Sequence, residues 1–160
     1  MGDEIESARL DGTTLIDHAA SALRGSGVVD VVSVVRGPLS SVDRVIVVHQ
    51  PQWALAPADV VTAVVAAVRA GADAAVPAVE VTETVKEVDA TGRIVRTVPR
   101  EDLVRLQYPR AVRAGFLRSD GSIAPGARTV TVPGAADAFP VRDVLDLQLA
   151  AAVLAARISA

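Results

Sequence analysis

Three short apolar runs most constrain how this chain of 160 residues folds. They occupy residues 28–35, 45–48 and 74–79 and consist mainly of valine and alanine. A run without polar alternation is typical of a strand with both faces buried, so we predict three buried strands of one sheet. Only residues 36–42 separate the first two runs, whereas a parallel crossover needs about a dozen residues or more. These two strands are therefore either antiparallel or joined by a stretched link.

Apolar residues at helical spacing predict three helices, over residues 14–24, 58–70 and 141–158. Thr13 or Thr14 can cap the first, while Pro57 is expected in the first turn of the second and Gly71 after its end. The last helix is expected to bury an apolar face made by Val144, Leu145, Leu147, Leu149, Val153 and Leu154. Strands that alternate with helices indicate an α/β fold.

A polar hairpin interrupts this pattern. Val81–Glu87 and Ile94–Val98 alternate in polarity, and Asp89-Ala90-Thr91-Gly92 lies between them, which predicts two antiparallel strands and a glycine-containing turn. An isolated hairpin is marginally stable, so this one needs a surface to pack against. Shorter elements are expected at 103–107 (a strand or turn), 112–117 (a helical turn) and 128–132 (a strand). We expect one α/β domain over 1–160, with an inserted β-arm at 80–103.

Composition excludes several functions. The chain has no cysteine and two histidines, which rules out thiolate chemistry and argues against a multi-histidine metal site. The net charge of −3 gives no overall attraction to nucleic acid or to an anionic membrane. The N-terminus is acidic and the most apolar stretch is too short to span a bilayer, so we expect a cytoplasmic protein.

The order of residues in several stretches resembles one enzyme family. These stretches are Leu15–Ala19, Val45–Leu55, Ala70–Ala78, Val81–Lys86, Arg96–Leu103 and Asp146–Ala150. Together they are similar to the 2-C-methyl-D-erythritol 4-phosphate cytidylyltransferase family of isoprenoid-precursor synthesis, and the arm is the most specific of them. The resemblance implies a shortened Rossmann-like nucleotidyltransferase sheet with a protruding β-hairpin arm. It also implies Mg²⁺-dependent transfer of a cytidylyl group from CTP to a sugar-alcohol phosphate, in a homodimer clasped through the arms.

Most positions that the family uses for this chemistry hold other residues here, and its glycine-rich phosphate loop has no match. The metal-binding aspartate position holds Gln50, and the substrate-binding arginine position holds Trp53. A Thr-Pro-Gln signature reads Tyr108-Pro109-Arg110, and a lysine position holds Pro140. We therefore assign no catalytic residue and no metal ligand, and we expect no cofactor unless the chain is active, in which case it is Mg²⁺.

Three arm residues do match the family: Thr84, Lys86 and Arg100. The resemblance implies that the threonine and arginine positions contact the sugar phosphate bound in the neighbouring subunit. The alternative is structural, with Thr84 and Lys86 as polar strand residues and Arg100 in a salt bridge with Glu101, Asp102 or the other arm.

Three hypotheses follow. The first is a degenerate family member without catalysis, acting as a homodimer through the arm or as the partner of a full-length homologue. The second is an active cytidylyltransferase in which Arg93, Arg105 or Arg110 compensates. The third is a small module that binds an anion or an acidic protein, motivated by the seven arginines between Arg93 and Arg118. The alternative interpretation of those arginines is a set of solvated side chains and ion pairs.

Overall fold

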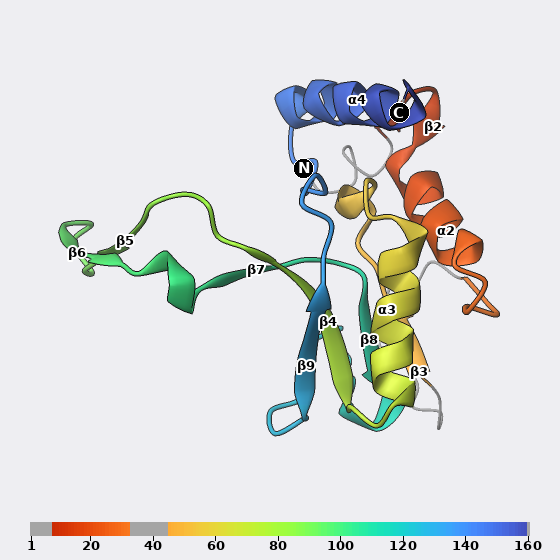
Figure 1. Cartoon of the computed structure of the whole chain (residues 1–160), viewed down its shortest axis with the longest axis horizontal. Helices are drawn as coiled ribbons and strands as arrows, with labels where there is room; N and C mark the ends of the chain where they lie inside the picture. Colours follow the sequence, from red (N-terminus) through yellow and green to blue (C-terminus); the bar gives the residue numbers. More distant parts are fainter. Residues whose placement is uncertain (1–7, 33–44, 160) are drawn as a thin grey trace.

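The computed structural model describes residues 8–32 and 45–159, and its centre is a mixed sheet (Figure 1). Four strands follow the order β3-β8-β4-β7, and β9 pairs with β4. β4 and β9 run parallel, whereas the β3–β8, β4–β8 and β4–β7 pairs are antiparallel. The strands are β3 (Val45–Val48), β4 (Ala74–Glu80), β7 (Val104–Leu106), β8 (Arg110–Arg113) and β9 (Thr129–Pro133).

Three α-helices of the described residues accompany the sheet. Helix α2 (Leu15–Gly25) begins after Thr14, whose hydroxyl oxygen accepts a hydrogen bond from the Asp17 backbone N–H at 3.2 Å. Helix α3 (Ala58–Arg69) covers one face of the sheet, and helix α4 (Val144–Ser159) lies across one end of the fold (Figure 1). The described residues also form the short elements β1 (Arg9–Leu10), β2 (Thr13–Thr14), η1 (Pro51–Trp53), η2 (Arg100–Asp102) and η3 (Ala114–Phe116).

Two apolar clusters hold these elements together. In the first, Val64 and Val68 of α3 pack against Ala75 of β4 and Ala111 of β8. In the second, Leu15 at the start of α2 meets the loop after η1 and the underside of α4, with Leu10, Leu55, Val141 and Ala150 as further members. The second cluster joins the two ends of the described chain at the end of the sheet where the candidate site lies.

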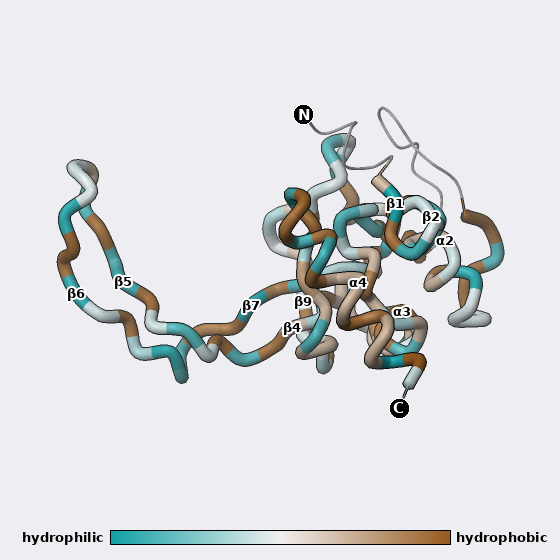
Figure 2. Tube along the Cα trace, turned by 90° about the horizontal axis from the view of Figure 1, so that it is seen from above, coloured by the Kyte–Doolittle hydropathy of each residue, from teal (hydrophilic) through white to brown (hydrophobic). Residues whose placement is uncertain are grey.

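The arm stands away from this body. Strands β5 (Val85–Val88) and β6 (Ile94–Val98) form the expected antiparallel hairpin. Its turn is closed by the Asp89 carboxylate, which accepts hydrogen bonds from the Thr91 and Arg93 backbone N–H groups. Gly92 takes a positive φ of 82°, which glycine adopts at no steric cost. Figures 1 and 2 show the hairpin held out at the end of two long connecting segments.

Several predicted elements need correction. Residues 28–32 form no strand and are partly exposed, and 33–35 lie outside the described residues. Strand preference in a valine-rich run reflects packing on a pleated surface, and residues 28–32 have no such pairing partner among the described residues. The turn predicted at 112–117 is the end of β8 followed by η3, because Val112 pairs with Ile46 and Ala74. Pro57 is the N-cap of α3 and not a first-turn residue.

Helix α4 forms where predicted but buries only part of its apolar surface. Leu147, Val153 and Leu154 pack against the second cluster, and Ala150 is buried. Val144, Leu145 and Leu149 face solvent instead, with Leu145 73% exposed. These exposed side chains lie on the part of α4 that the other described residues do not cover. Of the helices that the structure describes, none has the length and hydropathy to cross a bilayer.

Candidate functional site

Three segments that are distant in sequence meet at one end of the sheet. They are residues 49–53 after β3, residues 107–110 from the β7–β8 connection into the first residue of β8, and residues 134–141 before α4. The Val141 backbone N–H donates to the Gln52 carbonyl at 2.9 Å, which joins the first and third segments. These segments contain the five positions that the resemblance singles out: Gln50, Trp53, Tyr108, Arg110 and Pro140.

Gln107 joins the second segment to the third. It is 2% exposed, and its Nε2 donates to the carbonyls of Ala135 at 2.8 Å and Ala138 at 2.9 Å. Its Oε1 accepts from the Ala135 backbone N–H at 3.0 Å, so the buried amide is well satisfied. A Cβ at Gly134 would collide with this amide and would lie 3.1 Å from Val79 Cγ1. Gly134 therefore leaves the space that Gln107 fills.

An aromatic and cationic stack occupies the centre of the site. The rings of Trp53 and Tyr108 are 6.3 Å apart with an interplanar angle of 42°. The Arg110 guanidinium carbon lies 4.3 Å from the centre of the Tyr108 ring, within range of a cation–π contact. Trp53 is buried, as expected of a side chain that caps the core. Three of the five altered positions are thus brought into contact.

Among the described residues, two side chains at this end of the sheet have polar atoms without a hydrogen-bond partner. Both ring nitrogens of His49 and the Nε of Arg110 are buried without a hydrogen bond. They lie near each other along the ladder, because His49 follows Val48, whose register partner is Arg110. Burial lowers the pKa of His49 from 6.5 to about 4, so the imidazole is neutral at neutral pH.

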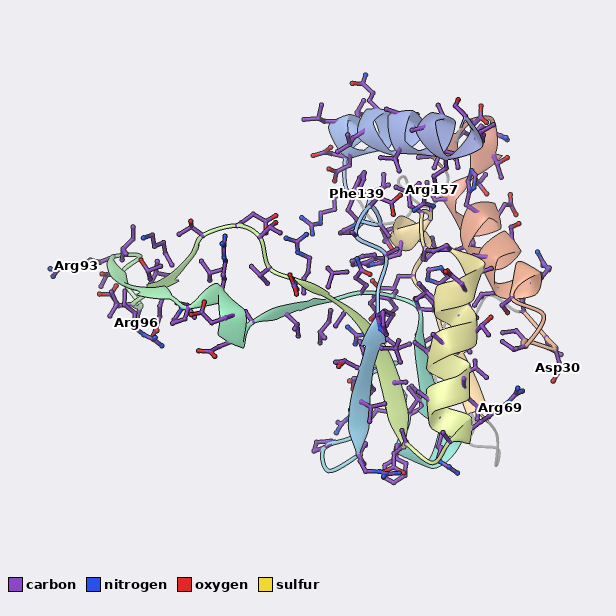
Figure 3. The ribbon with its side chains drawn as sticks, viewed as in Figure 1. Asp30, Arg69, Arg93, Arg96, Phe139 and Arg157 are labelled. Carbon is purple, nitrogen blue, oxygen red and sulfur yellow. The ribbon has the colours of Figure 1, made fainter. Side chains whose placement is uncertain are left out.

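The site does not fit a magnesium ion. Mg²⁺ prefers carboxylate and phosphate oxygens, whereas Gln50 is an exposed neutral amide and Pro140 has no side-chain ligand. The carboxylate of Asp137 is engaged by Arg157, whose Nε and Nη2 each donate to it at 2.8 Å, and this pairing lowers the pKa of Asp137. Figure 3 shows Arg157 beside Phe139 below α4. Within 8–32 and 45–159, no group of three histidine or acidic side chains gathers in a way that could hold a metal.

The arm residues that match the family lie apart from this stack. Thr84, Lys86 and Arg100 are exposed. Lys86 Nζ donates to Thr97 Oγ1 across the hairpin at 2.6 Å, and Arg100 Nη1 donates to the Thr82 carbonyl at 3.0 Å. The expected salt bridge of Arg100 with Glu101 or Asp102 is not formed, because its guanidinium turns to the backbone of the opposite segment.

The remaining arginines between Arg93 and Arg118 do not form one surface. Arg96 pairs with Glu87 and Arg105 pairs with Glu83, which lowers the pKa of Glu83. Arg113 donates instead to the carbonyls of Ala72 and Val68 near the end of α3. Arg93 and Arg96 lie at the tip of the arm, far from the body (Figure 3). The arginines are therefore distributed from the arm tip to the far end of α3.

Comparison with known proteins identifies the family. The model of the 2-C-methyl-D-erythritol 4-phosphate cytidylyltransferase family matches residues 37–156. The chain belongs to this cytidylyltransferase family. The family relative from Frankia casuarinae is 39% identical over 163 residues, which cover 89% of this chain and 61% of the relative. That from Saccharopolyspora erythraea is 38% identical, over 70% of this chain and 56% of the relative. This chain therefore spans less than two thirds of the length of these cytidylyltransferases.

Solved structures agree with the fold. The cytidylyltransferase of Thermus thermophilus superposes with a TM-score of 0.73 at 20% identity, over 95% of this chain and 94% of that one. The predicted fold, a Rossmann-like nucleotidyltransferase sheet with a protruding β-hairpin arm, is confirmed. Two site residues, Gln107 and Gly134, carried no signal in the sequence, because their contacts join segments that are 28 residues apart along the chain.

Proposed function

We propose that this chain is a cytidylyltransferase-family protein that does not transfer cytidylyl groups and that works as a pair of subunits joined through the arm. The observation that carries the proposal is the stack of Trp53, Tyr108 and Arg110 at positions where the family resemblance implies substrate-binding groups. At the other two positions the chain has Gln50 and Pro140, and Asp137 of the third segment is paired with Arg157.

The charge that phosphoryl transfer develops explains why the residues at these five positions bear on activity. Phosphoryl-group transfer depends on cations and metal ions that neutralise the charge developing on the phosphate oxygens. Arg110 is the one basic side chain among the five altered positions, and no carboxylate stands among them to hold a metal ion. One arginine offers little of the electrostatic stabilisation that a triphosphate and a second phosphate need in the transition state.

The arm supports the pairing half of the proposal. Val88, Ile94 and Val95 are exposed apolar residues of a two-stranded hairpin, and Val95 is 60% exposed. A two-stranded hairpin gains stability by packing this surface against another one. The occupant we favour is the arm of a second copy, with a full-length homologue as the alternative partner.

An activity assay tests the first half. Purified chain is incubated with CTP, Mg²⁺ and 2-C-methyl-D-erythritol 4-phosphate, with the Frankia casuarinae relative as positive control, and pyrophosphate is measured. We expect no release above a protein-free blank. Release above the blank would overturn the proposal in favour of an active enzyme in which Arg93, Arg105 or Arg110 compensates.

Light scattering coupled to size-exclusion chromatography tests the second half. We expect twice the mass of the chain for the native protein and a single-chain mass for Val95→Lys. Val31→Lys is the matched control, because Val31 is a similarly exposed valine of the body, 77% exposed, and should leave the dimer intact. A monomeric native protein that also fails to bind the tagged Frankia relative would refute arm pairing.

A further inference from the structure

Helix α4 presents a broad uncharged face to solvent, called the α4 face below. Three of its large apolar residues are strongly exposed: Val144 is 71%, Leu145 73% and Ile158 75% exposed. The solvent side of a surface helix ordinarily carries charged residues, whereas every exposed residue of α4 is uncharged. An exposed apolar patch of this kind is typical of a contact surface. The α4 face consists of Val144, Leu145, Gln148, Leu149, Ala151, Ala152, Ala155, Ala156, Ile158 and Ser159.

Both charged residues of α4 have partners within the chain. Arg157 pairs with Asp137 and donates to the Leu55 carbonyl. Asp146 Oδ2 accepts a hydrogen bond from the Arg142 backbone N–H at 2.9 Å. A helix that lies on a lipid surface usually combines its apolar face with several basic residues and aromatic side chains, and α4 has one arginine and no aromatic residue. The α4 face therefore fits a protein surface better than a membrane.

Part of the α4 face forms a stripe with the spacing of a helix pair, called the α4 stripe. Its members follow one another at intervals of four, three and four residues, which places them along one line of the helix. The large side chains occupy the N-terminal half of this line and the small ones the C-terminal half. They are Leu145, Leu149, Ala152 and Ala156.

This division makes the α4 stripe complementary to itself when one copy is turned end for end. In an antiparallel pair each leucine of one helix meets an alanine of the other, so large side chains pack against small ones. A parallel pair would instead set leucine against leucine at one end and alanine against alanine at the other. An interface between identical subunits related by a two-fold axis needs a surface that fits its own copy. The α4 stripe meets that requirement in the antiparallel direction.

Charge at the ends of α4 favours the same arrangement. When Leu145 lies opposite Ala156 of a second copy, the exposed Arg142 comes beside the C-terminal end of the second helix. A helix C-terminus carries partial negative charge, which attracts a cation. A parallel pair would place Arg142 beside Arg142 of the second copy, where the like charges repel.

We propose that the α4 face docks against the α4 face of a second copy, as an antiparallel helix pair in which the leucines of each α4 stripe pack against the alanines of the other. The exposed half of a 16-residue helix, about 24 Å long, offers on the order of 400 Å². A stable interface buries about 800 Å² per partner, so this contact is weak and forms at high chain concentration. It does not depend on arm pairing, because α4 lies on the body, away from the hairpin (Figure 1).

Cysteine cross-linking tests the register, and the chain suits this method because its sequence has no cysteine. Leu145→Cys and Ala156→Cys chains are mixed at high concentration and treated with a short bismaleimide. We expect a cross-linked pair in the mixture and none in Leu145→Cys alone, because the antiparallel register separates the two copies of position 145 by about 16 Å along the helix axis. Val31→Cys mixed with Ala156→Cys is the matched control, since Val31 is 77% exposed on the body and should give no pair.

The cross-linking outcomes separate the alternatives. Absence of a cross-linked pair in the mixture would overturn the proposal. Equal yields in the mixture and in Leu145→Cys alone would contradict the antiparallel register. Equal yields in the mixture and in the Val31→Cys control would show unspecific collisions and would overturn the proposal as well.

Sedimentation equilibrium measures the contact without a cross-linker. In the Val95→Lys chain, in which the arm contact is disrupted, the mean mass should rise from one chain toward two as concentration increases. Adding Leu145→Glu should abolish this rise, whereas adding Val31→Glu, the matched control, should preserve it. Leu145 is 73% exposed, so the substitution should leave the fold intact, which circular dichroism checks. A constant single-chain mass in Val95→Lys, or a rise that persists with Leu145→Glu, would refute the α4 contact and leave arm pairing untouched.

Discussion

The arm and the body site of this chain differ in how exposed their side chains are. The arm keeps the residues that match the family, and these residues are exposed, with Thr84 and Lys86 near the β5 strand and Arg100 on the return segment. The body site holds the stack of Trp53, Tyr108 and Arg110 and the buried amide of Gln107. The arm therefore presents exposed side chains, whereas the body site is organised largely by contacts within its own chain.

The body and the arm also differ in the interactions that stabilise them. In the body, burial of apolar side chains supplies most of the stabilisation, at roughly 25 cal/mol per Å² removed from water. In the arm, the observed contacts are backbone pairing and exposed polar pairs such as Lys86 with Thr97. Exposed pairs contribute about 0–1 kcal/mol each, so these contacts stabilise the arm of a single chain only weakly.

Replacing one leucine in each region is the strongest test of this comparison. Leu55 of the body is 2% exposed, and Leu106 at the root of the arm is 46% exposed. Leu55→Ala should lower the free energy of unfolding by about 2–5 kcal/mol, because it leaves a cavity in the core. Leu106→Ala should change it by less than about 0.5 kcal/mol. Urea unfolding measures both, and equal losses would mean that the arm root is as well packed as the body.

The contact between Gly134 and Gln107 gives the next largest effect. Gly134→Ala places a methyl group against the Gln107 amide and should cost about 1–3 kcal/mol. In a chain that already carries Gln107→Ala, the same change should cost clearly less, and this difference measures the coupling of the two positions. Gly115→Ala is the control, because nothing lies within 4 Å of its Cβ position. Additive losses would show that the amide and the glycine act independently.

Local patterns were sufficient for much of the fold. Helices α2 and α3, the hairpin and β4 follow from apolar spacing, a threonine cap and turn residues, which act over a few residues of chain. The runs at 28–32 and in α4 show the limit of such patterns. A valine run becomes a strand only beside a partner strand, and Leu145 is buried only if something lies over it, and neither condition can be read from local sequence.

The candidate site, like the fold, could be predicted from the sequence only in part. The family resemblance singles out Gln50, Trp53, Tyr108, Arg110 and Pro140 as site positions. That Trp53, Tyr108 and Arg110 stack together does not follow from it, because the resemblance says nothing of how side chains from two distant segments pack against one another. Gln107 had no signal, because a glutamine after a short strand is ordinarily exposed and its acceptors come from a distant loop.

The pH dependence of stability tests the buried state of His49. Its pKa is about 4 in the folded chain and near 6.5 when unfolded, so between these values the unfolded state binds more protons. Stability contributed by this residue is complete above pH 6.5 and falls as the pH drops toward 4. Between about pH 7 and about pH 5 the free energy of unfolding should fall by about 2 kcal/mol.

Urea unfolding at both pH values measures this fall, and His49→Gln should remove that part of the pH dependence of stability. An unchanged slope in His49→Gln would show that His49 is solvated.

Ion pairs provide the smallest and most closely matched comparison of the two regions. Arg157 and Asp137 form two hydrogen bonds at 2.8 Å in the body, with Arg157 partly buried, whereas Arg96 and Glu87 meet through one contact of 2.6 Å on the exposed arm. Asp137→Asn should cost about 1 kcal/mol, because it weakens a two-pronged pair that also orients Arg157 toward the Leu55 carbonyl. Glu87→Gln should cost less than about 0.5 kcal/mol in the single chain, since solvent screens the pair.

Unfolding of both variants in low and high salt separates the cases: the arm variant should differ from the native chain only at low salt, whereas the body variant should differ at both. If Glu87→Gln cost as much as Asp137→Asn at high salt, the arm would be shielded from solvent in the native protein, and pairing with a second arm would be the simplest source of that shielding.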